Sequence, residues 1–547
     1  MRKSKKQPPQ GRAGDRLDSW KEIAVYLKRG VRTVQRWEKS EGLPVYRHLH
    51  KKMGSVYADK VELDAWWHNQ RPHQKQQGKT ERPLADTAQA SIAVLPFVNL
   101  GPDQENEYFS DGMTEELINA FAKVPGLRVV SSTSTFQFKG RAQNVCDIGE
   151  QLNVRTVLEG SVRNAKNRLR ITARLIDVTN GYQIWSETYN REFRDVFAIQ
   201  DEIARAIVSK LRIKLIDEQA LPLVKPNTGN LEAYHLYLKG RHCWNQRTRK
   251  GFKEGIEHFQ GAIEKDPEFA LAHAGLADSC NMLGYYSYVS PTKAFPEAKR
   301  AALKALEIDD TLAEAHTSLA FVRMFYDWDW AAAEEEFKRA LELKPEYATA
   351  HYWYGLNLTP LGRTYEAIAH VRKAQQLDPS SPIINAYVAG AFYFARQYDK
   401  AIEKCLRTLE MDPNFGLARL ILGWAYRQQA MFEEAIAEFQ KALTFFKGSG
   451  DALAALGHTF ARSGRTSEAR RVLEGLKKPS PGTYVSPGHT ALVYLGLDQK
   501  DEALKWLQKA YQDRYAWLVF LKVDPIFDSL RSDPKFRDLV RRVRLES

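Results

Sequence analysis

Cysteine is scarce in this chain, and its cysteines are not spaced like ligands. Only four occur in 547 residues, and they stand far apart at Cys146, Cys243, Cys280 and Cys405. None forms a C-x-x-C pair, the spacing typical of zinc and redox centres. The sequence therefore argues against a disulfide framework and against a cysteine-based metal site.

Long apolar runs and catalytic signatures are also missing. No run approaches the roughly 18 apolar residues of a membrane-spanning helix, and the N-terminal stretch MRKSKKQPPQGRAGDR lacks the apolar segment of a signal peptide. The motifs G-x-x-x-x-G-K-[ST], G-x-S-x-G and H-E-x-x-H do not occur. We expect a cytoplasmic protein that is not an enzyme, with no membrane partner, no catalytic residues, no cofactor and no metal.

Positive charge is concentrated at the start of the chain. Residues 1–85 contain 20 Lys and Arg against 9 Asp and Glu, a net charge of +11, whereas the whole chain carries +13. This asymmetry predicts an anionic partner for the N-terminal segment alone, with a basic solubilising tail as the alternative. Residues 1–15 are expected to be a disordered basic tail.

Residues 16–68 are predicted to form a small module that begins with two short helices. Ser19-Trp20-Lys21-Glu22 has the spacing of a capping box, and apolar residues follow it on one helical face. Gly30 breaks this helix, and a second helix is expected to begin near Arg32. Its predicted outward face carries side chains that can bind base edges or phosphates, namely Arg32, Thr33, Gln35 and Arg36.

A β-hairpin is predicted after the second helix, with its turn at Lys52-Met53-Gly54. Its arms and tip carry side chains suited to phosphate contact, namely Arg47, His48, His50, Lys51 and Lys52. A third helix, capped by Asp59, is expected to close the module. Beyond it, residues 69–90 are polar, rich in Gln and without periodicity, which predicts a flexible linker.

The stretch SWKEIAVYLKRGVRTVQRWEKSEGLPVYRH resembles the winged helix-turn-helix domains of the MerR and excisionase type. Lys28-Arg29-Gly30 stands in the turn where such domains often have Gly and then Ser, so the cap of the second helix is weaker here. The resemblance implies a fold that binds double-stranded DNA through residues 16–68. A small helical domain without a role in DNA binding is the alternative.

Residues 91–217 change to the pattern of an α/β domain. Apolar runs, alternating segments and the hairpin signal Asn180-Gly181 predict the order β-α-β-α-β-β-β-α, hence a mixed sheet with helices packed on it. The strands are expected at residues 92–97, 127–131, 156–162, 168–178 and 182–189, and the helices at residues 114–121, 145–152 and 196–215. The segments IAVLPFVNLGPDQENEYFSDGMTEELINAF, VLEGSVRNAKNRLRITARLIDVTNGYQIWSETY and VFAIQDEIARAIV resemble the TolB amino-terminal-like domain, a family that implies no defined chemistry.

A period of 34 residues organises the rest of the chain. Alanine recurs at positions 367, 401, 435, 469 and 503, and a small residue precedes each by twelve positions, at Gly355, Ala389, Gly423, Gly457 and Ala491. Prolines that end helices follow the same period at Pro345, Pro379, Pro413 and Pro481. Small residues at matched points of two helices let their backbones approach closely.

This pattern resembles the tetratricopeptide repeat, which implies an all-α solenoid that binds a protein or peptide. We expect about eight helix pairs over residues 231–513 and capping helices over residues 514–547, which cover the last apolar face. One unit is longer than the period, and an extended loop is expected around Tyr285 to Thr292.

Two groups of residues suggest chemistry. Asp111 with Glu115 and Glu116 could hold a cation, but Asp111 is expected to cap a helix whose first turn is acidic. His273, His316 and His351 recur at one repeat position. Neighbouring helices lie about 8 to 10 Å apart, whereas zinc needs nitrogens at about 2 Å, so we expect these histidines to line a groove or pack between helices.

Aromatic residues gather in the stretches NMLGYYSYV and FVRMFYDWDW. Contact with a bound peptide and packing between repeats explain them equally well.

The sequence as a whole favours a bacterial DNA-binding transcriptional regulator whose TolB-like and repeat regions bind a protein or ligand, with homodimerisation on two half-sites as a possible arrangement. The alternative is a protein-interaction scaffold with no sequence-specific DNA binding.

Overall fold

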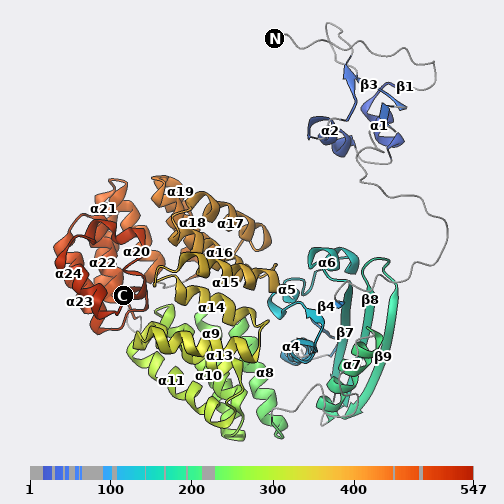
Figure 1. Ribbon diagram of the computed structural model, residues 1–547, viewed down its shortest axis with the longest axis horizontal. Helices are drawn as coiled ribbons and strands as arrows, with labels where there is room; N and C mark the ends of the chain where they lie inside the picture. Colours follow the sequence, from blue (N-terminus) through green and yellow to red (C-terminus); the bar gives the residue numbers. More distant parts are fainter. Residues whose placement is uncertain are drawn as a thin grey trace. The chain divides into compact units, whose positions relative to one another are not determined.

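The chain separates into two compact units, Met1–Ala88 and Gln89–Ser547. The computed structural model (Figure 1) describes residues 16–27, 31–40, 43–47, 56–60, 62–63, 90–101, 107–122, 124–141, 143–165, 168–192, 195–211, 228–446, 450–479 and 484–545. The predicted tail 1–15 and nearly all of the predicted linker 69–90 lie outside these ranges. Within them, no helix combines the length and the apolar content that crossing a bilayer requires.

The described residues of the first unit include helices α1 and α2 and a small antiparallel sheet. Helices α1 (Trp20–Tyr26) and α2 (Val31–Ser40) accompany strands β1 (Arg16–Leu17), β2 (Tyr46–Arg47) and β3 (Val56–Asp59), in the order β1-β3-β2. Pairing of β2 with β3 agrees with the predicted hairpin arms. Strand β1 was not predicted, because two residues are too few to show a pattern.

The predicted cap of α1 is present. The backbone N–H of Glu22 donates to Ser19 Oγ at 3.2 Å, and the Glu22 carboxylate accepts from the N–H of Asp18 at 2.9 Å. Together these bonds satisfy donors at the helix start. Ile23 and Val34 then pack together in the core of this unit with no exposed surface.

The second unit begins with a mixed sheet, as predicted. Its strands, given in the order in which they pair, are β6 (Leu127–Val129), β4 (Ala90–Val94), β7 (Thr156–Ala165), β8 (Arg168–Asp177) and β9 (Gln183–Glu192), with β5 (Val98–Asn99) also on β7. Strand β4 pairs in parallel with β6 and β7, and β5 also pairs in parallel with β7. The pairs β7–β8 and β8–β9 are antiparallel.

Helices cover the two faces of this sheet unequally. On one face, α4 (Glu107–Ala122) and α7 (Val196–Lys210) bury apolar residues of β4, β7 and β8. On the other, α6 (Val145–Gln151) packs in a smaller cluster that includes Ala93 and Val157, and α5 (Ser132–Phe136) lies against β4. Sequence patterns missed β5 and α5, which have two and five residues.

In the described ranges between residues 228 and 512, sixteen α-helices follow as eight antiparallel pairs (Figure 1), and a π-helical turn, η3 (Arg323–Asp327), continues α12. They are α8 (Leu231–Asn245), α9 (Arg249–Lys265), α10 (Ala270–Tyr285), α11 (Pro291–Ile308), α12 (Ala313–Val322), α13 (Trp330–Leu343), α14 (Ala348–Leu358), α15 (Thr364–Leu377), α16 (Pro382–Phe394), α17 (Tyr398–Met411), α18 (Gly416–Gln428), α19 (Phe432–Phe445), α20 (Gly450–Arg462), α21 (Thr466–Lys477), α22 (Pro487–Gly496) and α23 (Lys500–Gln512).

The periodic small residues hold each pair together. All five alanines of the period are buried. A Cβ atom built on Gly355 would lie 2.9 Å from the carbonyl oxygen of Ala367 and 2.7 Å from Val371 Cγ1. At Gly423 it would lie 2.5 Å from the ring of Phe439. These distances are shorter than van der Waals contact. The two helix backbones therefore approach closely at Gly355, as predicted, whereas Gly423 makes room for the ring of Phe439.

One expectation about the solenoid needs correction. The longer second unit has no extended loop, because only residues 286–290 separate α10 from α11. Its additional residues lengthen these helices to 16 and 18 residues.

The C-terminal segment does more than cover the last helix. It forms two short 3₁₀ helices, η4 (Ala516–Phe520) and η5 (Pro525–Leu530), and α24 (Pro534–Arg542). Trp330 Nε1, in the third helix pair, donates to the carbonyl of Val543 at 3.2 Å, and Tyr393 Oη, in the fifth, donates to Asp524 Oδ1 at 3.1 Å.

A buried polar contact joins the sheet domain to the repeats. Asp378, which follows α15 and is completely buried, accepts hydrogen bonds from the hydroxyls of Ser131, Thr133 and Ser134 at the start of α5. Burial raises the pKa of the Asp378 carboxyl from 3.8 to about 6, although the serine hydroxyls oppose this shift. Keeping the Asp378 carboxyl ionised in the folded protein therefore costs more free energy than ionising it in the unfolded chain.

We predict that Asp378→Asn makes stability less dependent on pH between about 4 and 6. In this window the folded wild type holds a proton that the unfolded chain has lost, so the free energy of unfolding falls as pH rises, by up to roughly 3 kcal/mol. The variant lacks this titration. Urea denaturation across the window measures it, with Asp498→Asn at an exposed position as control. Equal pH slopes for the wild type and D378N would contradict the prediction.

Candidate functional site

Helix α2 carries four of the nine residues predicted to contact DNA: Arg32, Thr33, Gln35 and Arg36. Val34 anchors the helix in the core, and Trp37 is packed against that core. Arg47 ends strand β2. His48, His50, Lys51 and Lys52 lie outside the described residues. The structure thus places the first five on α2 and the hairpin arm, and their contact with DNA stays a prediction.

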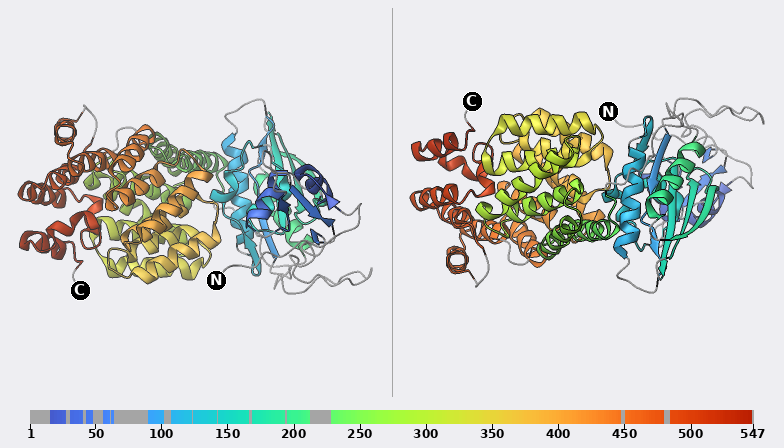
Figure 2. Two further views of the ribbon diagram at one scale, coloured as in Figure 1. Left: turned by 90° about the horizontal axis from the view of Figure 1, so that it is seen from above. Right: turned by 90° about the horizontal axis from the view of Figure 1, so that it is seen from below.

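The second unit contains a cleft of about 850 Å³ between α4 and the first repeats. Both views of Figure 2 show α4, in light blue, between the sheet and the repeat helices. The cleft is lined by aromatic and charged side chains, among them Glu115, Tyr237, Arg241, Trp244, Asp278 and Tyr347. No sequence pattern indicated this group, because its members are spread over more than two hundred residues of the sequence and meet only through the fold.

Charges in the cleft lie close together but are not fully paired. Arg241 Nε is 3.7 Å from Glu115 Oε2, and Arg241 Nη1 is 3.8 Å from Asp278 Oδ2. Burial raises the pKa of Asp278 to about 6, although Arg241 opposes the shift. Both distances exceed those of good hydrogen bonds, so these groups retain capacity to bind a ligand.

Trp244 forms the aromatic centre of the cleft. The guanidinium groups of Arg247 and Arg241 lie 3.6 and 4.7 Å from its ring centre, a cation–π arrangement. Its indole Nε1 is buried and has no hydrogen-bond partner in the described part of the chain. The cleft therefore offers guanidinium groups, carboxylates and aromatic faces to a ligand.

Asp111 does not cap a helix, so that prediction is wrong. Helix α4 begins at Glu107, and Asp111 lies inside it. Its carboxylate accepts from Lys139 Nζ at 2.5 Å and lies 2.9 Å from Nδ1 of His242 on α8. Nearby, Asn245 donates to Glu115 Oε1 at 2.6 Å. The contacts with His242 and Asn245 dock α4 on the first repeat, and Glu115 and Asn245 also line the cleft.

The periodic histidines fasten the turns between repeats. In His273, His316 and His351, Nε2 lies 2.9, 2.9 and 3.0 Å from a carbonyl oxygen six residues earlier. Later repeats use other donors at this position, with Asn385 and Arg419 donating to the carbonyls of Pro379 and Pro413. Within the described ranges, no group of three or more His, Cys, Asp or Glu residues could hold a metal ion.

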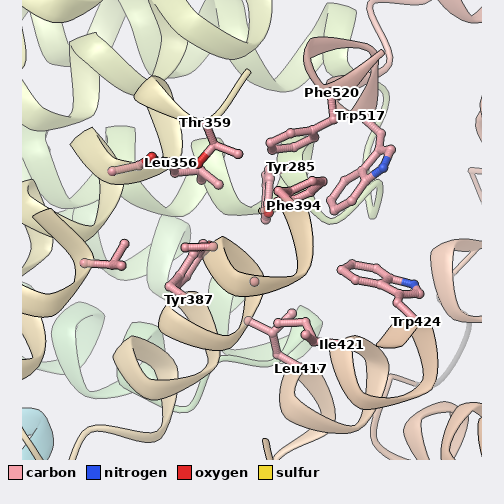
Figure 3. A pocket seen from close by; sticks show the side chains of 14 residues that line it. Tyr285, Leu356, Thr359, Tyr387, Phe394, Leu417, Ile421, Trp424, Trp517 and Phe520 are labelled. Atoms are coloured by element: carbon pink, nitrogen blue, oxygen red, sulfur yellow. Dashed lines mark hydrogen bonds between the residues drawn. The ribbon is translucent and has the colours of Figure 1, made fainter. Parts of the chain in front are cut away.

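An aromatic cluster fills the interior beneath the C-terminal segment (Figure 3). Phe520 stacks on Phe394 with ring centres 4.7 Å apart, and Trp517 lies 5.2 Å from Trp424. Together with Tyr285 they surround a cavity of only about 30 Å³, which is too small for a ligand. The aromatic stretches of the second and third repeats are thus used mainly for packing.

Phe520→Ala should destabilise the second unit by about 3 to 5 kcal/mol, because Phe520 is completely buried and its removal leaves a cavity. Phe445→Ala, at the exposed end of α19, is the matched control and should cost less than about 1 kcal/mol. Urea denaturation followed by tryptophan fluorescence compares the two variants. Similar losses would show that the C-terminal segment is only loosely packed.

The comparison with protein families matches two parts of the chain. Residues 88–206 match the family described as "HilA/YgeH-like transcriptional regulator, second domain". Residues 328–382 and 389–452 match the tetratricopeptide repeat, which confirms the predicted repeats there. The resemblances to MerR or excisionase domains and to the TolB amino-terminal-like domain stay predictions.

Known proteins are similar over part of their length. "Putative adenylate cyclase 3" of Rhizobium meliloti is 35% identical over 262 residues, 48% of this chain and 44% of that protein. "Transcriptional regulator HilA" of Salmonella typhimurium is 20% identical over 323 residues, 58% of this chain and 56% of that protein. The chain spans about half the length of these curated relatives. A solved structure is that of YrrB, described as a tetratricopeptide-repeat protein with an unusual peptide-binding site. It is 24% identical to this chain, with a TM-score of 0.24. The match covers 37% of this chain and 98% of YrrB.

Proposed function

We propose that this protein is a cytoplasmic DNA-binding transcriptional regulator whose cleft and repeats bind a protein or peptide. The observation that carries the proposal is the order of its parts. A segment that resembles a transcriptional regulator domain, residues 88–206, directly follows a segment with a net charge of +11, residues 1–85. Strong positive charge confined to one small unit is typical of nucleic-acid-binding domains.

In this proposal the first unit is a winged helix-turn-helix domain. The order α1, α2, β2, β3 and the burial of Val34 support it, since a recognition helix must be fixed by its apolar side. Arg32, Gln35 and Arg36 then contact base edges in the major groove, and the hairpin binds phosphates. A homodimer would place two such helices on two half-sites.

The cleft is the proposed binding site for the signal. Its volume lies within the range of ligand sites, and its walls combine Glu115 of α4 with Arg241, Trp244 and Tyr347 of the repeats. A peptide bound there contacts the regulator-like domain and the repeats together, so it can alter how they dock. We propose no enzymatic activity, because the similarity to the cyclase-named relative covers less than half of either chain.

Arg32→Ala with Arg36→Ala should weaken binding to the specific DNA sequence most. Loss of a base contact costs about 1 to 3 kcal/mol, whereas random duplex should be affected less. Lys51→Ala with Lys52→Ala should weaken binding to both duplexes alike and lower the salt dependence, because lysine–phosphate contacts carry no sequence information. The specific sequence is obtained first by capture of genomic fragments on the full-length protein, and affinities follow by titration at several salt concentrations.

The two double variants serve as controls for each other. Equal losses on specific and random duplex for both would contradict the division between α2 and the hairpin. Failure of the wild type to enrich any sequence, with no salt-dependent binding to duplex, would favour the scaffold alternative.

A further inference from the structure

Strands β7, β8 and β9 present a polar face outside the part of the sheet that α5 and α6 cover. Their pairing places nine side chains on it in three cross-strand rows: Arg163, Arg170 and Asn190; Ser161, Thr172 and Thr188; Glu159, Arg174 and Ser186. The alternate residues Val162, Leu169, Ile171 and Leu175 face the apolar core on the other side. We call these nine residues the Arg163–Arg170 face.

Positive charge on this face is not balanced. Arg163 and Arg170 stand directly opposite each other and are exposed, and their side chains make no ion pair or hydrogen bond in the described part of the chain. Arg168, two residues along β8, is likewise exposed and forms no ion pair there, and the register places the carboxylate of Glu192 opposite it. Only Arg174 has a partner, Glu159, at 2.9 Å. Like charges directly opposite each other destabilise a sheet, so this arrangement favours an anionic ligand.

The chemistry of the face distinguishes between anionic ligands. Arg, Ser, Thr and Asn are side chains that donate hydrogen bonds to phosphate oxygens. None of the nine residues is aromatic, so the face offers no ring on which unpaired bases could stack. It also lacks the aromatic or apolar anchors that provide most of the binding energy in protein interfaces. The phosphates of duplex DNA fit these properties better than single strands or an acidic protein.

We infer that the Arg163–Arg170 face binds the phosphate backbone of duplex DNA as a second, sequence-independent contact surface. The inference rests on the proposed function, in which the first unit reads the sequence. Because the two units belong to one chain, binding of one raises the effective concentration of the other at the same DNA molecule. The face therefore increases affinity without changing sequence preference.

The test compares two double variants of the full-length protein that remove the same charge. Arg163→Ser with Arg170→Ser alters the face. Arg470→Ser with Arg471→Ser, exposed on α21 and without an ion pair in the described residues, is the matched control. Affinities for specific and random duplex are measured over a series of salt concentrations.

We expect R163S/R170S to bind both duplexes about tenfold more weakly. The slope of log affinity against log salt should become shallower by about 2, one for each lost phosphate contact. The ratio of specific to random affinity should stay unchanged, and the control should bind like the wild type. R163K/R170K, which keeps the charge, should retain most of the affinity. Thermal unfolding of R163S/R170S should be unchanged or shifted upward, since a like-charge pair is removed.

Different outcomes separate the inference from the proposed function. If R163S/R170S binds duplex like the control, the inference is overturned while sequence-specific binding by the first unit stands. If R163S/R170S keeps duplex binding but loses binding to polyglutamate, the face recognises an acidic protein and the inference is also overturned. If the wild type binds no duplex at all, the proposed function fails and the inference fails with it.

Discussion

The second unit depends on the close approach of two helix backbones in each repeat. Where Gly355 meets the carbonyl of Ala367, there is no room for a methyl group. The later pairs also carry a small residue at this register position, namely Ala389, Gly423, Gly457 and Ala491, so each pair is added in a similar geometry, and the stack curves back on itself. Tyr286 of the second repeat thereby comes within 6.1 Å of Phe446 after the sixth, measured between ring centres. The curvature encloses the interior in which the C-terminal segment packs.

This filled interior limits where the repeats can bind a partner. Under the C-terminal segment, Trp517 and Phe520 fill the interior of the repeats, and only a small cavity is left. Open space is found instead beside α4, where the sheet domain docks on the first repeat. The candidate binding site is therefore a feature of the joint between two domains. Repeats without the sheet domain would not form it.

The joint itself is polar. Asp111 with His242, Glu115 with Asn245, and Asp378 with the hydroxyls of α5 hold the two domains together. Buried polar contacts contribute little net free energy when both partners are present, but they are costly when one partner is lost. A ligand that competes for Glu115 or Arg241 can therefore change the docking of the regulator-like domain. In the proposed function, binding of a ligand in the cleft is thus transmitted to the sheet domain through these docking contacts.

Periodic and local features could be predicted from the sequence because they depend on near neighbours. The 34-residue period indicated the helix pairs, Asn180-Gly181 indicated the turn between β8 and β9, and Ser19 indicated the start of α1. Predictions failed where a boundary or a contact depends on distant residues. Asp111 suits a helix N-terminus locally, but α4 begins earlier, and His242 from α8 is the partner of its carboxylate.

The sequence by itself thus determined the three kinds of segment, their order and the concentration of positive charge in the first of them, since each is expressed in composition or spacing. Only the tertiary structure decided which side chains meet. Glu115, Arg241 and Tyr347 form one cleft because three helices distant in sequence converge. Arg163 and Arg170 form one face because the register of two strands places them opposite each other. Register and convergence are set by burial across the whole unit, which no local pattern contains.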